Sequence, residues 1–463
     1  MNFMVSLLDV IERATVGKIC SEKDFDLKIF TLKLKDVIRK YGVSYDPDIP
    51  VPSDPGLADS VFKAAFEFFC EVGAYCIDTQ RIIFFDESEV KEKIRISPSQ
   101  VILGEGVDRK ALTSRKPEDP NPPWCFLGAA GVAVSSDDVF LKLVEGYGRI
   151  PYINSLTTPA LTRVNGMRIR PGSPLEVLGS MRTVVLAREA LRRAGRPGLP
   201  IMNSIATAST AVSLISALHP DFGLRKSDGV MIGAIAELKT NFDLLNRACV
   251  ANTLGMVLGV DCGPLLGGYC GGAEGTAIVT AAYHIMTSLV YNALWYVMFP
   301  IHIKYSSSSN PELIWARSVS AQAISRNTHF PSLYISYTAS GPCTDTCLYE
   351  IAAQISSVVA SGASIEAAGI AKGKYEDRMT PMEPKFAAEV AYATAGMRLR
   401  DVNDIVKKII PKYIDKIANP PLGLRFQECY DIETIKPSSK YLEIYSKVKR
   451  EIEDLGIKFN QSP

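Results

Sequence analysis

The chain has 463 residues, which is too long for one small domain and suits a large barrel or open sheet that carries an extension. Its 51 Lys and Arg residues balance 50 Asp and Glu residues, so the net charge of +1 gives no electrostatic reason to expect a nucleic acid or an anionic membrane as a partner. Asp9, Glu12 and Arg13 interrupt the apolar N-terminal segment, which therefore predicts an amphipathic helix, no targeting peptide and a cytoplasmic protein.

Residues 1–100 are predicted to form a helical layer that packs on the rest of the protein. Two helical patterns flank a loop rich in Pro and Asp: DFDLKIFTLKLKDVIRKYG and GLADSVFKAAFEFFCEVG. Residues 376–463 are again helical in pattern, and we expect them to complete and flank the central domain.

Residues 101–375 alternate short apolar runs with long helical patterns, which indicates parallel strands joined by helices. Seven or eight such units predict an α/β fold of the (β/α)₈ TIM barrel type. A doubly wound open sheet is the alternative, and the absence of a Gly-x-Gly-x-x-Gly turn after the first strand disfavours it. The barrel strands are expected to include residues 150–156, 199–202, 256–261, 301–305 and 333–337.

The run of residues 276–303 contains no Asp, Glu, Lys or Arg and is long enough to span a bilayer. Its many polar residues favour a buried helix followed by a barrel strand, FPIHIKY. The ten cysteines form no Cys-x-x-Cys pair, so we expect them to be reduced and mostly buried. With four histidines and no His-x-x-x-His spacing, no metal site is predicted.

The predicted strands end in polar or small residues, and in a barrel these ends converge on one mouth. The residues expected around that mouth are Asn154, Met202, Asn203, Glu237, Asp261, Tyr305 and Tyr337. Two carboxylates there, Glu237 and Asp261, would hold a cation or work as acid and base. For each residue alone, a loop residue with satisfied hydrogen bonds is the alternative interpretation.

A glycine-rich segment, GPLLGGYCGGAEGTA, follows the predicted strand at residues 256–261. Its glycines would allow close approach of another molecule, although a tight loop is the simpler alternative. It is not a P-loop, because it has no Gly-Lys-Ser/Thr.

The sequence resembles the monomethylamine:corrinoid protein methyltransferase family over the whole chain, because several motifs occur in the same order and at the same spacing. They are GRPG, AELKTN, GPLLGGYCGG, ASGPCTDTC, AKGKYEDRMTPME, EVAYATAG and FQECYD. The resemblance implies a (β/α)₈ barrel, a homo-oligomer such as a hexamer, and a separate small corrinoid protein as the partner. It implies no cofactor bound tightly by this chain.

In that family the strand after GRPG carries pyrrolysine, whose imine is proposed to capture methylamine, and the matching position here is Met202. The resemblance implies that Glu237 and Asp261 match family glutamates and that Tyr337 matches a family tyrosine. Ile335 matches a family glutamine. We therefore predict Glu237, Asp261 and Tyr337 as catalytic residues, and Met202, Asn203, Ile335 and Tyr337 as the substrate site.

Without the imine, an already activated methyl donor such as a quaternary ammonium remains suitable, since its nitrogen leaves as a neutral amine. The chain has no Asp-x-His-x-x-Gly signature for cobalamin, so the corrinoid is expected on the partner. The leading hypothesis is methyl transfer from a methylated amine to Co(I) of a separate corrinoid protein. The alternatives are a monomethylamine methyltransferase that works without pyrrolysine, and a non-catalytic barrel that serves as a binding or assembly subunit.

Overall fold

The computed structural model describes residues 5–204 and 210–459. Its centre is a parallel sheet of eight strands in the order β12-β8-β6-β20-β19-β17-β15-β13. A Cβ built on Gly229, in β13, would lie 2.9 Å from the Cα of Met202, in β12. The two ends of the sheet are therefore adjacent, and the predicted barrel is confirmed. The strands are β6 (Cys125–Gly128), β8 (Ser155–Thr157), β12 (Ile201–Asn203), β13 (Gly229–Gly233), β15 (Val257–Cys262), β17 (Trp295–Met298), β19 (Ser332–Thr338) and β20 (Ser364–Ile370).

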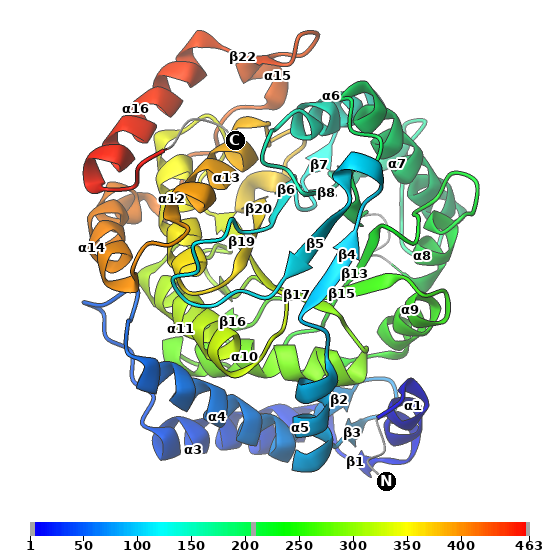
Figure 1. Cartoon of the computed structure of the whole chain (residues 1–463). Helices are drawn as coiled ribbons and strands as arrows, with labels where there is room; N and C mark the ends of the chain where they lie inside the picture. The colour runs from blue at the N-terminus through cyan, green and yellow to red at the C-terminus, as the bar shows by residue number, and fades with distance from the viewer. Residues whose placement is uncertain (1–4, 205–209, 460–463) are drawn as a thin grey trace.

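A helix follows each barrel strand, and together these helices surround the sheet (Figure 1). Several begin at a side-chain cap: Ser136, Asn241 and Thr344 each accept a hydrogen bond from a backbone N–H in the first turn. The helices are α6 (Asp137–Gly148), α7 (Pro174–Arg193), α8 (Ala211–Ala217), α9 (Phe242–Thr253), α10 (Ala273–Val290), α11 (Pro311–Asn327), α12 (Asp345–Ala360) and α13 (Met382–Thr394).

The apolar run of residues 276–303 forms the buried helix α10 and then β17, as predicted in outline. In the described part of the chain, no helix has both the length and the apolar character that crossing a bilayer requires. The prediction of a barrel strand at residues 301–305 is wrong. Only Ile301–His302 is extended, and this short β18 pairs with β16 (Leu265–Leu266) outside the barrel. The more apolar run WYVM lies in the barrel, and Pro300 separates it from β18.

The N-terminal region packs on α10 and α11 through α4 (Pro55–Val72), as the blue helices in Figure 1 show. Its other main helices are α1 (Leu7–Val16), α3 (Thr31–Tyr41) and α5 (Glu87–Ile96). A small sheet also belongs to this region, and its strand β2 (Ala74–Cys76) pairs with β14 (Lys239–Thr240), which lies in the segment between β13 and α9. At the other end of the chain, α14 (Leu399–Ile409) and α16 (Ser439–Leu455) pack on α12.

A hairpin of β4 (Gln100–Leu103) and β5 (Lys110–Thr113) lies across the end of the barrel at which the strands begin (Figure 1). Gly104 donates a backbone hydrogen bond to Ser227, which precedes β13. Three hairpin side chains, Val101, Leu103 and Leu112, belong to the apolar cluster inside the barrel. The hairpin therefore closes this end, and the opposite end, where the strands finish, is called the mouth below.

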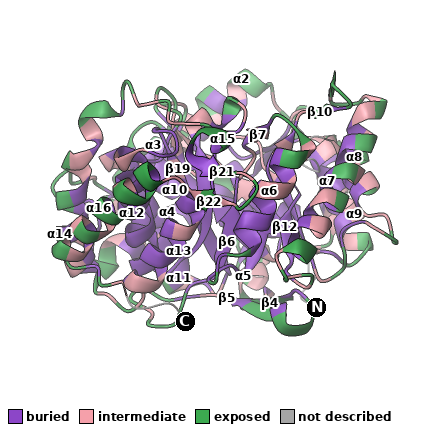
Figure 2. Cartoon of the chain, turned by 90° about the horizontal axis from the view of Figure 1, so that it is seen from above, coloured by how far each residue is buried: buried purple, intermediate pink, exposed green. Residues whose placement is uncertain are grey.

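Side chains alternate between the inside of the barrel and the surrounding helices. In β17, Trp295 and Val297 belong to the inner cluster, whereas Tyr296 and Met298 pack outward. The strands form the buried centre of the molecule in Figure 2. Where the register between neighbouring strands is continuous, a residue paired with an inner residue also points inward.

The indole of Trp295 fills the middle of the barrel. A Cβ on Gly259 would lie 2.1 Å from the Trp295 ring, and a Cβ on Gly229 would lie 3.1 Å from it. Phe126 meets the same ring edge-on, with ring centroids 6.0 Å apart. The two glycines therefore provide the space that the indole occupies.

We predict that Gly259→Ala lowers the free energy of unfolding by about 1–3 kcal/mol, because the added methyl group overlaps the indole. Gly56→Ala is the matched control, since Gly56 is exposed in the first turn of α4 and a Cβ there meets only the end of the Asp54 side chain. Chemical denaturation measures both variants. Equal stability of the two would show that the indole is not fixed against Gly259.

Candidate active site

Met202 lies in the floor of the mouth, which is the apolar layer formed by Trp295, Met202, Phe126 and Met231. The Met202 side chain is fully buried, and its Cγ lies 3.2 Å from the position that a Cβ on Gly229 would take. A thioether at this position offers packing surface and no proton or electrophile.

Asp261 stands one inward position beyond Gly259 on β15, toward the mouth. It pairs in register with Val297 of the inner cluster and with Gly233. A Cβ on Gly233 would lie 3.1 Å from Asp261 Oδ1, so this glycine leaves room for the carboxylate. Burial raises the pKa of Asp261 to about 6.

Glu366, on β20, is a second carboxylate inside the barrel that the sequence interpretation missed. It is fully buried and pairs in register with Phe126 and Ile335, which both belong to the inner cluster. Burial first, and then the charge of Asp261, raise the pKa of Glu366 well above its usual range. The two carboxyl groups therefore interact across the barrel. The available signal was one charged residue in the apolar run SIEAAGI.

The polar groups near Glu366 leave acceptors without donors. Neither oxygen of Glu366 receives a hydrogen bond of normal geometry in the described structure, although Thr157 lowers its pKa by interacting with it. Asn203 donates from Nδ2 to Thr157 Oγ1 at 3.4 Å, and its buried Oδ1 has no donor among the described residues. Buried acceptors without donors are unfavourable, so this polar layer is suited to a ligand that supplies positive charge or N–H groups.

Tyr337 adds an aromatic ring to the inner side of β19. Its ring lies at a centroid distance of 6.5 Å from Phe299, nearly parallel, and a Cβ on Gly369 would overlap it. Ile335, one inward position earlier, belongs to the inner apolar cluster. Burial raises the pKa of Tyr337, so its hydroxyl keeps its proton at neutral pH.

A β-bulge between Ile335 and Tyr337 is held by Gln354 of α12. The backbone N–H of Tyr337 donates to Gln354 Oε1 at 2.9 Å, and Gln354 Nε2 donates to the Tyr337 carbonyl at 3.3 Å. Arg317 donates to the Ile335 carbonyl at 2.7 Å. Side chains behind the sheet thus replace the ladder bonds that the bulge removes, and they fix the backbone of Tyr337.

Glu237 lies in the loop after β13 and contacts the glycine-rich loop. Its Oε2 accepts a hydrogen bond from the Cys270 thiol at 3.2 Å. Burial raises its pKa to about 7, while the charges that shift it are those of Asp26 and Lys239, which face the N-terminal region. The structure therefore associates Glu237 with a loop at the mouth, whereas Asp261 interacts with Glu366.

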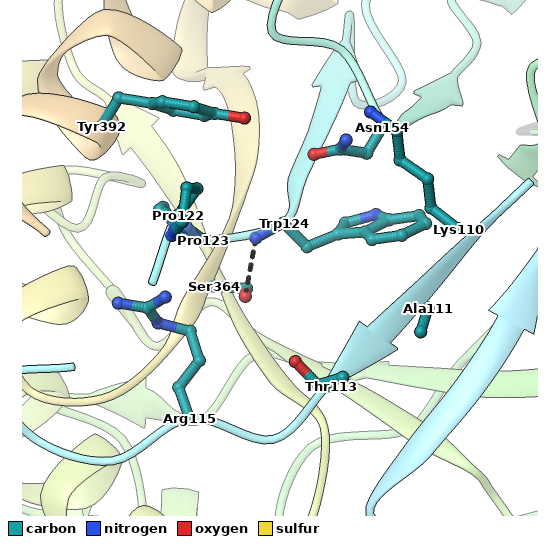
Figure 3. Close-up of a pocket in the computed structure, with 10 residues that line it drawn as sticks. All are labelled: Lys110, Ala111, Thr113, Arg115, Pro122, Pro123, Trp124, Asn154, Ser364 and Tyr392. Atoms are coloured by element: carbon teal, nitrogen blue, oxygen red, sulfur yellow. Dashed lines mark hydrogen bonds between the residues drawn. The ribbon is translucent and has the colours of Figure 1, made fainter. Parts of the chain in front are cut away.

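One residue predicted at the mouth, Asn154, is placed differently. Asn154 precedes β8 instead of ending a strand, and it lines a pocket at the opposite end of the barrel (Figure 3). The prediction for Asn154 is therefore wrong, because the apolar run at residues 150–153 turns before the strand begins. Tyr305 follows β18, and its ring stacks on His302 at 4.3 Å.

The fold and the carboxylates inside the barrel define a (β/α)₈-barrel enzyme whose polar site lies near the carboxyl ends of the strands. The family model described as monomethylamine methyltransferase MtmB matches residues 5–457. The chain belongs to this family of methyltransferases.

Similar proteins agree with this assignment along the whole chain. Monomethylamine methyltransferase MtmB3 of Methanosarcina barkeri strain Fusaro is 33% identical over 452 residues, which cover 97% of this chain and 98% of that protein. MtmB of Methanosarcina mazei is 33% identical over 454 residues, with the same coverage. The crystal structure of Methanosarcina barkeri MtmB matches with a TM-score of 0.95 and 32% identity, over 99% of this chain and 100% of that one.

We predict that Met202→Leu changes the free energy of unfolding by less than about 1.5 kcal/mol and changes methyl transfer only modestly, because the swap conserves volume and neither side chain is reactive. Thermal unfolding and a methyl-transfer assay check both expectations. Loss of transfer in a variant that keeps its stability would instead assign the sulfur a chemical role.

Proposed function

We propose that the chain transfers a methyl group from a methylated amine to Co(I) of a separate corrinoid protein. The observation that carries the proposal is the pair formed by half-buried Asp261 and fully buried Glu366 above an apolar floor, where burial raises the pKa of Asp261 despite the positive charge of Arg247. Membership of a monomethylamine methyltransferase family supports the choice of an amine. A solved relative is described as the hydroxylamine MtmB complex, so a protein of this fold and family has been solved with a small N–H compound.

The carboxyl pair is matched to one positive charge. Two buried acids that repel each other do not ionise together, so the pair carries a single negative charge near neutral pH. The ring of Tyr337 offers a face to the same cation. The apolar floor, which includes Met202 and Ile335, receives the methyl groups, and Asn203 supplies a further acceptor.

Holding the amine as a cation prepares its methyl group for transfer. Cobalt(I) supplies both electrons of the new bond to carbon, and nitrogen keeps the pair of the broken C–N bond. An ammonium therefore leaves as a neutral amine, whether it was protonated or quaternary. The chain's contribution is to orient the C–N bond and to keep the charge on nitrogen until transfer.

The corrinoid protein is proposed to dock at the mouth on the glycine-rich loop. Glu237 fixes this loop through Cys270, and Gly267 and Gly271 have positive φ values of 87° and 68° that suit glycine. We therefore assign Glu237, whose carboxylate was predicted to be catalytic, a positioning role in docking. A homo-oligomer, implied by the family resemblance, remains part of this proposal.

The direct experiment mixes the purified chain with free cob(I)alamin, or with a small corrinoid protein, and follows formation of methyl-Co(III) by absorbance. The donors are methylammonium, dimethylammonium, trimethylammonium and tetramethylammonium. Transfer from one or more of them supports the proposal, and the preferred donor identifies the number of N–H groups that the site accepts. No transfer from any donor with either acceptor would support a non-catalytic barrel.

With the preferred donor, we predict that Asp261→Asn weakens binding at least about 30-fold, the equivalent of about 2 kcal/mol for losing a buried counter-charge. Glu366→Gln is expected to weaken binding less, because Glu366 is the member of the pair that retains its proton. The double variant removes all negative charge and should show no transfer. Asp221→Asn, at an exposed carboxylate, is the control for the charge change. Wild-type rates in the double variant would refute the cation site.

We predict that affinity for methylammonium and tetramethylammonium rises as the pH increases through about 6 and becomes constant above about 7. The cation stabilises the ionised form of Asp261, whose pKa of about 6 is raised by burial, so binding releases a proton below that pH. Tetramethylammonium keeps its charge at every pH, which assigns the dependence to the protein. Titration calorimetry from pH 5 to 8 measures it, and an unchanged profile in Asp261→Asn would contradict the assignment.

A further inference from the structure

A pocket of about 230 Å³ lies at the end of the barrel where the strands begin, away from the mouth (Figure 3). It is formed where the hairpin of β4 and β5 meets the barrel wall. Lys110 and Thr113 come from β5, Ser364 from the start of β20 and Tyr392 from α13. None of the ten residues that line it is acidic.

Two hydrogen-bond acceptors of this pocket already accept from backbone N–H groups. Asn154 Oδ1 accepts from the N–H of Cys125 at 2.8 Å, and Ser364 Oγ accepts from the N–H of Trp124 at 3.0 Å. Asn154 therefore has its Nδ2 group left to offer, and Ser364 has its hydroxyl hydrogen. The hydroxyl groups of Thr113 and Tyr392 are further donors on the same lining.

Positive charge accompanies these donors. Arg115 is 5% exposed, and its Nη groups donate to the backbone carbonyls of Asn121 and Asp119. Its Nε–H has no acceptor among the described residues. Burial lowers the pKa of Arg115, and the charge of Asp119 offsets only part of that effect. Lys110, an exposed residue of β5, is the second cation of the lining.

We propose that this pocket binds a small oxyanion, either a phosphate group or a carboxylate. Donors from four separate elements and two cations converge there, and no lining carboxylate competes for them. The bound anion joins the hairpin to β8, β20 and α13, and so stabilises the closure of the barrel. This site is distinct from the proposed methyl-transfer site and does not depend on it.

The test is titration calorimetry and thermal unfolding of the full chain with inorganic phosphate, acetate or chloride at equal ionic strength. We expect saturable binding of phosphate or acetate and a rise in Tm with concentration, because a ligand that binds only the folded state stabilises it. Tighter binding of phosphate would assign a phosphate group, and tighter binding of acetate a carboxylate. An equal response to all three salts would show an adventitious ion only.

Lys110→Gln and Tyr392→Phe are each expected to lower the affinity for the preferred anion about fivefold or more. The rate of methyl transfer should stay unchanged in both variants. Arg109→Gln is the matched control. Arg109 is an exposed neighbour outside the pocket lining, and this substitution removes one positive charge, as Lys110→Gln does. Circular dichroism verifies that each variant is folded. Unchanged affinity in both pocket variants, or an equal loss in Arg109→Gln, would overturn the proposal.

Discussion

The indole of Trp295 packed inside the barrel determines the depth of the mouth. It can lie there because Gly229 and Gly259 have no side chain, and the hairpin residues Val101 and Leu112 belong to the same apolar cluster on the closed side. A barrel interior of this kind is a filled core and not a channel. Ligands that enter from the mouth therefore stop at an apolar floor.

The position of this floor explains the chemistry above it. Asp261 is the next inward residue after Gly259 on β15, so the carboxylate is held directly over the apolar layer. Glu366 approaches from the other side of the barrel, and the charge of Asp261 adds to the effect of burial in raising the pKa of Glu366. Burying acidic groups is unfavourable unless positive charge or hydrogen-bond donors compensate. Arg247 offsets only part of the effect of burial on Asp261, so a cationic ligand at the mouth would stabilise the pair further.

The barrel was predictable from sequence because few other folds are compatible with apolar runs that alternate with helical patterns. Asp261 and Tyr337 were predicted near the mouth because each lies at the end of a predicted strand. Glu366 was missed because it stands in the middle of a strand, where only the register with Phe126 and Ile335 shows its direction. The prediction for Asn154 was wrong for a related reason. A polar residue after an apolar run marks the start of β8 as readily as the end of a strand, and only pairing distinguishes the two.

Strand β20 separates two environments of opposite character within two residues. Ser364 faces a pocket whose free groups are donors and cations, whereas Glu366 faces a layer whose unpaired groups are acceptors. Both residues point to the inside of the barrel, since residues two apart in a strand share a face. The apolar layer around Trp295 fills the barrel interior between the hairpin and the mouth, so an anion at the closed end and a cation at the mouth do not share solvent. The same packing that closes the barrel thus allows one fold to hold two charge-selective sites that recognise different ligands.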